Sequence, residues 1–138
     1  MKKIMFLCTG NSCRSQMAEA WCRFLFPDSL SAYSAGTKKH GMNERAIKVM
    51  AELGVDLSSH FSKTVEELPT NSFDLVITVC SDAHETCPYF PGKVSHVGFD
   101  DPPRLTKDMN DEEEILKVYR RVRDEIGEFI KTLPNLLN

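Results

Sequence analysis

The chain is organised around one stretch close to its start, Phe6-Leu7-Cys8-Thr9-Gly10-Asn11-Ser12-Cys13-Arg14-Ser15. The apolar run at residues 4–7 predicts a buried strand that ends at Cys8, and a helical pattern begins after the short loop. Such a loop binds a tetrahedral oxyanion through backbone amides and the positive end of the helix dipole. The same field lowers the pKa of a cysteine thiol. A tight turn would explain each residue singly, but not this combination.

The predicted oxyanion site consists of the loop residues themselves. Arg14 presents a planar fork of donors that suits two oxygens of a phosphate-like ion. Ser12 and Ser15 are expected to donate hydrogen bonds to the thiolate or the anion, and Gly10 to permit backbone angles that larger residues resist. The predicted oxyanion-binding residues are Thr9, Gly10, Asn11, Ser12, Cys13, Arg14 and Ser15.

Length and composition narrow the class of protein. The 138 residues fit one domain, 1–138, and a net charge of -3 argues against a nucleic-acid partner. The apolar run after Lys3 is too short for a signal peptide or a membrane span, so we expect a cytoplasmic protein with no membrane partner. Five cysteines in a reducing compartment argue against a static disulfide framework. Because no large apolar stripe is evident, we expect a monomer.

Apolar strands that alternate with amphipathic helices predict a three-layer α/β fold with a parallel sheet. Strands are predicted at residues 4–7, 30–34, 75–79 and 94–99. Helices are predicted from Met17 to before Pro27, from Asn43 to Gly54, and from Asp111 to Leu133, with a capping box of Asp111 and Glu114. Residues 56–72 are expected to be irregular with at most one helical turn, and residues 105–110 to form a loop.

Side chains of chemical interest follow directly on three of the predicted strands. They are Cys8, Cys80 and the pair Asp100-Asp101. Ligands of open α/β sheets bind outside the carboxyl ends of the strands. We therefore expect two thiols and a carboxylate to meet at one edge of the sheet.

At these residues the chain resembles a known family. The loop from Cys8 to Ser15 is similar to the phosphate loop of low-molecular-weight protein tyrosine phosphatases, and Asp101-Pro102 is similar to their general acid. More narrowly, the chain resembles thioredoxin-coupled arsenate reductases in blocks that span nearly its whole length. These blocks are residues 11–19, 79–83, 87–88, 98–102 and 121–127. The resemblance implies a flavodoxin-like fold with a four-stranded parallel sheet flanked by helices.

The resemblance also implies a reaction, the reduction of arsenate to arsenite in arsenic detoxification. Cys8 would attack arsenate held by the loop and Arg14, while Asp101 protonates the departing oxygen. Cys80 would then attack Cys8 and release arsenite, and Cys87 would move the disulfide to Cys80–Cys87, where thioredoxin reduces it. This relay requires residues 81–86 to differ between redox states.

The resemblance assigns the acid, and the chemistry of the other residues suggests their roles. Asp101 is preferred to Asp100 because it directly precedes Pro102. Phosphate or sulfate would mimic arsenate, a weak phosphatase side activity is expected, and no cofactor or metal is implied. Cys13 and Cys22 are expected to be buried thiols outside the relay, and His40 to be structural or solvated.

Other functions remain open at this point. The chain could be a tyrosine phosphatase in which Cys80 and Cys87 are incidental, or a non-catalytic oxyanion-binding or arsenical-binding module. A zinc site at Cys80 and Cys87 with His84 lacks further ligands. Glutaredoxin is an alternative reductant, although a second resolving cysteine favours thioredoxin.

One departure from the family pattern concerns potassium. Several of these reductases resemble a potassium-binding design with an Asn, a Glu, a Ser and an Asp. The first three match Asn11, Glu19 and Ser34, but the fourth position is Lys63. Because an ammonium cannot ligate a cation, we expect weak or no dependence on potassium. His60 is expected either to hydrogen-bond to the loop or to be structural.

Overall fold

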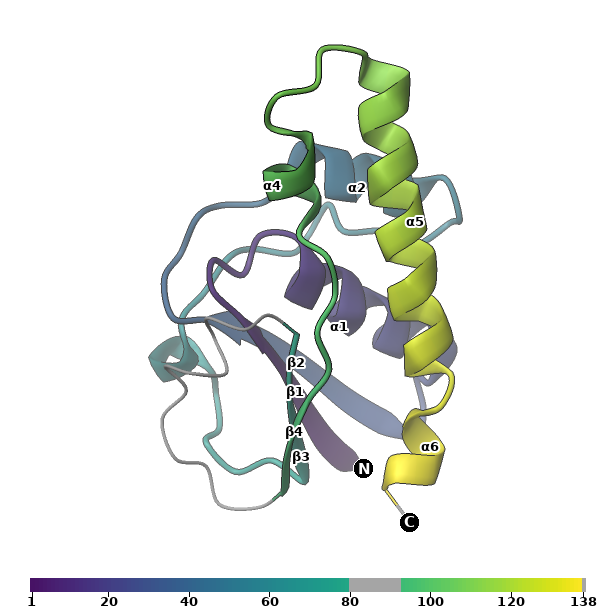
Figure 1. Ribbon diagram of the computed structural model, residues 1–138. Coiled ribbons are helices and arrows are strands. Elements are labelled where there is room, and N and C mark those ends of the chain that lie inside the picture. The colour runs from purple at the N-terminus through teal and green to yellow at the C-terminus, as the bar shows by residue number, and fades with distance from the viewer. Residues whose placement is uncertain (80–92, 138) are drawn as a thin grey trace.

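Four parallel strands form the sheet of the computed structural model, which describes residues 1–79 and 93–137 (Figure 1). The strands are β1 (Lys2–Cys8), β2 (Leu30–Gly36), β3 (Leu75–Thr78) and β4 (Lys93–His96), in the order β2-β1-β3-β4. This arrangement confirms the expected α/β class. Residues 4–7 of β1 are fully buried between two strands, which explains why the run is apolar without alternation.

Helices connect the strands and pack over the sheet. They are α1 (Arg14–Leu25), α2 (Glu44–Ala51), the 3₁₀ turn η1 (Val65–Glu67), α4 (Pro102–Thr106), α5 (Glu112–Ile130) and α6 (Leu133–Leu136). Helix α1 lies against β1 and β2, and α5 packs along α1 and against α2 (Figure 1). In the two described ranges, no helix is both long and apolar enough to cross a membrane.

The helix boundaries follow the local signals in the sequence. Helix α2 begins after Asn43, whose side chain accepts a hydrogen bond from the Ala46 amide at 3.0 Å. Gly54, at φ 78°, follows its last turn. Helix α5 begins after Asp111, but its expected capping box with Glu114 is wrong. Asp111 accepts from the Glu113 amide at 3.2 Å, and Glu114 pairs with Lys117.

Two further predictions about local structure were wrong near the carboxyl edge of the sheet. The strand predicted at residues 94–99 ends at His96, which pairs with the last residue of β3, Thr78. The next residues continue alongside β3 only through single hydrogen bonds to its end. Residues 102–106 form helix α4 although 105–110 were expected to be a loop, because Pro102 suits the first position of a helix.

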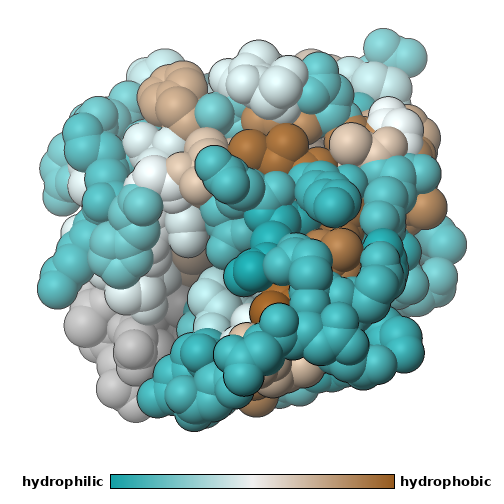
Figure 2. Space-filling view, turned by 90° about the horizontal axis from the view of Figure 1, so that it is seen from above, coloured by the Kyte–Doolittle hydropathy of each residue, from teal (hydrophilic) through white to brown (hydrophobic). Residues whose placement is uncertain are grey.

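Large apolar side chains that reach the surface are spread over several elements. They are Met1, Phe24, Leu53, Phe61, Val94, Leu105 and Leu136. On the face seen in Figure 2, apolar atoms form small groups between hydrophilic side chains. Scattered groups of this size are ordinary on a protein surface. A monomeric state stays a prediction.

A glycine sets the distance between α1 and α5. A Cβ at Gly127 would lie 2.9 Å from the indole ring of Trp21, whose Nε1 donates to the Arg123 carbonyl at 3.0 Å. This hydrogen bond fixes the same edge of the indole that faces Gly127, so the ring cannot easily move away from an added side chain. The two helices therefore approach as closely as they do because residue 127 has no side chain.

We predict that Gly127→Ala destabilises the protein by about 1–3 kcal/mol, because overpacking a close contact costs this much. Helix propensity alone predicts the opposite, a gain of about 1 kcal/mol. The measurement is the free energy of unfolding in urea. Glu128→Ala, on the exposed side of the same turn, is the control and should stay within about 0.5 kcal/mol of the wild type. A more stable Gly127→Ala variant would contradict the packing argument.

Candidate active site

The site lies at the turn where β1 ends and α1 begins. This turn opens into a pocket of about 550 Å³ whose other wall is the chain from Gly98 to Arg104. The pocket is lined by Cys8, Thr9, Gly10, Ser12, Cys13, Arg14, His40, Gly98, Phe99, Asp100, Asp101, Pro103 and Arg104. The structure thus brings Cys8, Arg14 and Asp101 together, as expected. Cys80 and Cys87 lie outside the described residues.

The carbonyl groups of the loop are all engaged from outside it. Those of Thr9, Gly10 and Ser12 accept the amides of residues 38, 40 and 43 at 3.0–3.1 Å. The carbonyl of Asn11 accepts from the Gln16 side chain, and that of Cys13 from the Met17 amide. In a peptide unit the C=O and the N–H point in opposite directions. Because these carbonyls bond to partners outside the loop, the N–H groups of the same peptide units point inward, as an anion site requires.

Cys8 is buried, with 4% of its surface exposed, and lies among hydrogen-bond donors. Its Sγ is 2.8 Å from the Ser15 hydroxyl, and the Asn11 amide donates to it at 3.3 Å. The Asn11 side chain in turn donates to the Ser15 oxygen at 2.8 Å. Because that oxygen accepts from Asn11, the Ser15 hydroxyl can direct its hydrogen toward the sulfur. The Ser15 hydroxyl and the Asn11 amide, as donors to the sulfur, favour the thiolate form of Cys8.

The expected role of Gly10 in backbone flexibility was wrong. Positive φ falls instead on Asn11, at 51°, where an Asn side chain tolerates the left-handed region. What Gly10 provides is space, because a Cβ there would lie 2.3 Å from Nδ1 of His40. His40, expected to be structural or solvated, lies on the loop and lines the pocket.

Arg14 connects the loop to the opposite wall. One Nη donates to the Phe99 carbonyl at 3.0 Å, and the other lies 3.6 Å from the Asp101 carboxylate. The Asp100 carboxylate instead pairs with the guanidinium of Arg121 on α5, with 3.0 Å between Nη2 and Oδ2. The two neighbouring carboxylates therefore have different partners, and Asp101 is the one beside the guanidinium of the loop.

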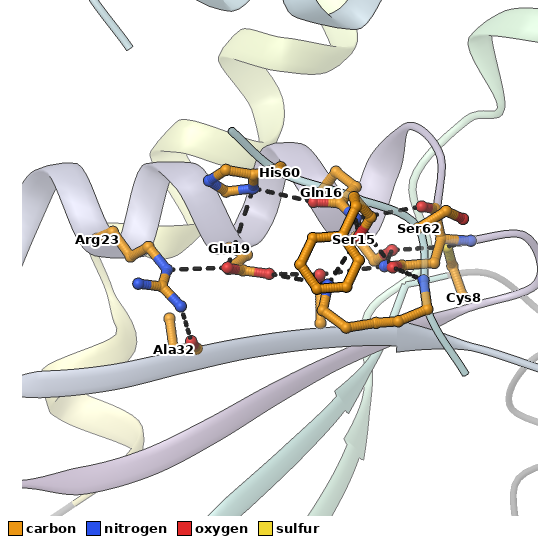
Figure 3. A network of polar contacts seen from close by, with 12 residues as sticks. Cys8, Ser15, Gln16, Glu19, Arg23, Ala32, His60 and Ser62 are labelled. Atoms are coloured by element: carbon orange, nitrogen blue, oxygen red, sulfur yellow. Dashed lines mark hydrogen bonds and ion pairs between the residues drawn. The ribbon is translucent and has the colours of Figure 1, made fainter. Parts of the chain in front are cut away.

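A buried polar network lies behind the loop (Figure 3). Its centre is the carboxylate of Glu19, which accepts from Ser34 at 2.5 Å and from Arg23 at 2.8 Å. The Lys63 ammonium lies 4.0 Å from the same carboxylate, and His60 Nδ1 lies 3.9 Å from it. Two cationic side chains, Arg23 and Lys63, thus accompany one buried acid. An oxygen cage for potassium does not fit here, because the fourth position carries an amine.

Gln16 belongs to this network, and the sequence analysis did not single it out. Its Nε2 donates to Asn11 Oδ1 at 2.9 Å and to the Phe61 carbonyl at 2.9 Å, while its Oε1 lies 3.0 Å from His60 Nδ1. The available signal was only an uncharged polar residue between the loop and the first apolar position of the predicted helix, and the structure buries it in the first turn of α1. Buried amides of this kind need partners, and here all of them come from the loop and its support.

The remaining thiols are shielded, as expected. Burial raises the pKa of Cys13 to about 12, against the opposing effect of Arg14, and burial raises the pKa of Cys22 to about 12 as well. Burial therefore favours the protonated form of both thiols. Among residues 1–79 and 93–137, no three His, Cys, Asp or Glu side chains gather as metal ligands.

The network predicts a pH dependence of stability. Burial lowers the pKa of His60 below its ordinary 6.5; Glu19 opposes this effect, and Arg23 and Lys63 add to it. Below pH 6.5 the unfolded chain therefore takes up the proton first, and stability is lost as the pH falls through the lowered pKa. His60→Asn keeps a donor near Nδ1 without the titration.

We expect the unfolding free energy of His60→Asn to fall less steeply than that of the wild type between pH 7 and pH 5. Urea unfolding across this range is the measurement, with His40→Asn as the control on an exposed histidine. Equal slopes for wild type and His60→Asn would refute the assignment.

Comparisons with known proteins agree with this geometry. The model of the family described as low molecular weight phosphotyrosine protein phosphatase matches residues 3–138. The arsenate reductase of Bacillus subtilis (strain 168) is 48% identical over 132 residues, covering 94% of this chain and 93% of that protein. The structure of an arsenate reductase from Archaeoglobus fulgidus DSM 4304 matches with a TM-score of 0.74 and 32% identity, over 94% of this chain and 97% of that one. A low molecular weight protein tyrosine phosphatase from T. tengcongensis matches with a TM-score of 0.78 and 25% identity, over 99% and 100% of the two chains. Because the family model spans nearly the whole chain, the protein belongs to the low molecular weight phosphotyrosine protein phosphatase family.

Proposed function

We propose that this protein is an arsenate reductase that forms a covalent intermediate on Cys8 and is regenerated by thioredoxin. The observation that carries the proposal is the pocket in which Cys8, Arg14 and Asp101 converge. Near full-length relatives that are arsenate reductases support the choice of arsenate over a phosphate ester.

The first step is a displacement at arsenic. The Cys8 thiolate attacks arsenate held by the loop residues from Thr9 to Ser15, and a sulfur–arsenic bond forms. Asp101 gives a proton to the departing oxygen, which leaves as water. Arg14 lies between the loop and Asp101, so its guanidinium binds oxygens of the anion while it orients the acid.

The second step supplies two electrons. A thiolate of Cys80 attacks the Cys8 sulfur, the sulfur–arsenic electron pair stays with arsenic, and arsenite leaves. Cys87 then attacks Cys80, which restores the Cys8 thiol and moves the disulfide to Cys80–Cys87. The chain enters this segment from Val79, whose amide donates to the Leu7 carbonyl at 2.9 Å. The residues that precede Cys80 and Cys8 are therefore neighbours in the sheet.

Thioredoxin is the proposed reductant, and the cytoplasm the proposed location, because a dithiol relay needs a reducing pool. A weak phosphatase side activity belongs to the same proposal. Phosphate esters carry the same tetrahedral group, and the nucleophile, the arginine and the acid of phosphate-ester cleavage are all in the pocket.

We predict that Cys8→Ser, Cys80→Ser and Cys87→Ser each abolish arsenate-dependent NADPH oxidation in the presence of thioredoxin and thioredoxin reductase. Cys87→Ser should still release one arsenite per molecule in a single turnover and accumulate a Cys8–Cys80 disulfide, visible by mass spectrometry. Cys80→Ser should release none. Cys22→Ala, a buried thiol outside the relay, is the control and should keep turnover. Multiple turnovers by Cys80→Ser or Cys87→Ser would defeat the relay.

We also predict that potassium has little effect on turnover, because Lys63 already brings a positive charge to Glu19. Rates in KCl and NaCl at equal ionic strength should agree within about twofold, a difference of a few tenths of a kcal/mol. Lys63→Asp should gain a response to potassium, whereas Lys39→Asp, the same change on the surface, should not. Strong activation of the wild type by potassium over sodium would count against this assignment.

A further inference from the structure

A second arginine, Arg104, lines the pocket and has no part in the reaction above. It lies on α4, which Figure 1 labels, three residues after Asp101, and it lines the same pocket as the loop between β1 and α1. Within residues 1–79 and 93–137 every other arginine pairs with a carboxylate: Arg14, Arg23, Arg45, Arg120, Arg121 and Arg123 do so. Arg104 is the exception in this part of the chain, and its side chain is exposed.

The charges around the pocket leave Arg104 uncompensated. Of the two carboxylates in its wall, Asp101 faces Arg14 and Asp100 pairs with Arg121 at 3.0 Å. The Arg14 guanidinium already donates to the Phe99 carbonyl and lies beside Asp101, so only some of its N–H groups remain to bind an anion. The free positive charge at the mouth of the pocket therefore comes from Arg104.

Such a charge matters because the protein as a whole repels its substrate. The chain carries a net charge of -3, and arsenate near neutral pH is largely a dianion. A local cation in the wall of a cleft reverses that repulsion where the anion enters and raises its local concentration. A guanidinium is suited to this, since it is always charged and can contact two oxygens at once.

We propose that Arg104 is a specificity-determining residue that binds the outward oxygens of a small, doubly charged tetrahedral oxyanion. The inference rests on the proposed function for the identity of the substrate as arsenate, but the anion contact itself does not. His40 borders the same pocket from the segment that covers Gly10, so Arg104 is not the only polar side chain besides the loop that an anion meets there.

The test compares Arg104→Gln and Arg104→Lys with Lys107→Gln, which removes the same charge three residues further along, outside the pocket lining. Binding of inorganic phosphate is measured by calorimetry, which needs no turnover. Arg104→Gln should weaken phosphate binding and raise the KM for arsenate by about tenfold each, the worth of one charge-assisted contact, with kcat nearly unchanged. Arg104→Lys should fall between wild type and Arg104→Gln. Lys107→Gln should bind phosphate within about twofold of the wild type.

Salt dependence gives a second readout of the charge at residue 104. The dissociation constant of phosphate should rise with NaCl less steeply in Arg104→Gln than in the wild type. The proposal would be overturned if Arg104→Gln and Lys107→Gln lost equal phosphate affinity, or if Arg104→Gln bound phosphate as the wild type does. It would also be overturned if the wild type did not bind phosphate. A wild type that binds phosphate but does not reduce arsenate would refute the proposed function and leave this inference standing.

Discussion

The side-chain amide of Asn11 is the constraint on which the site depends. Its Nδ2 donates to Ser15 and Ser34, and its Oδ1 accepts from Gln16 and from the Lys63 amide. Because both ends of the amide are satisfied by different elements, it has one orientation. That orientation holds residue 11 at positive φ and directs its own N–H to Cys8. The hydrogen bonds of the Asn11 side chain therefore fix the conformation of the loop without a bound anion.

The network behind Asn11 carries a buried charge, and its composition reflects the cost of burial. A carboxylate removed from water needs both hydrogen bonds and opposite charge. Glu19 has Ser34 and Arg23 as hydrogen-bond partners and Lys63 as a second cation at 4.0 Å. The support of the loop is therefore complete with the chain's own side chains. These side chains position Asn11 through Ser34 and Gln16.

The sequence allowed the architecture and the front of the site to be predicted with few errors. Buried strands such as β1 are readable because full burial makes them continuously apolar, and the Cys8–Ser15 loop because its residues are adjacent. Errors occurred where local pattern and tertiary context compete. Residues 97–99 have strand-like composition but lie beyond the last paired residue of β3, and residues 102–106 lack helical periodicity but begin with a proline at a favourable position.

By itself, the sequence determined the α/β class and the loop between β1 and α1, and it predicted Cys8 as the nucleophile, because these depend on residues close together along the chain. The family resemblance already favoured Asp101 over Asp100, and only the tertiary structure gives the physical reason, since Asp100 pairs with Arg121 of α5 while Asp101 lies beside Arg14. The tertiary structure also decided that His40 covers Gly10 and that Arg104 lacks a carboxylate partner in the described chain. These are contacts between segments distant in sequence. Their partners are selected by packing, which no local pattern records.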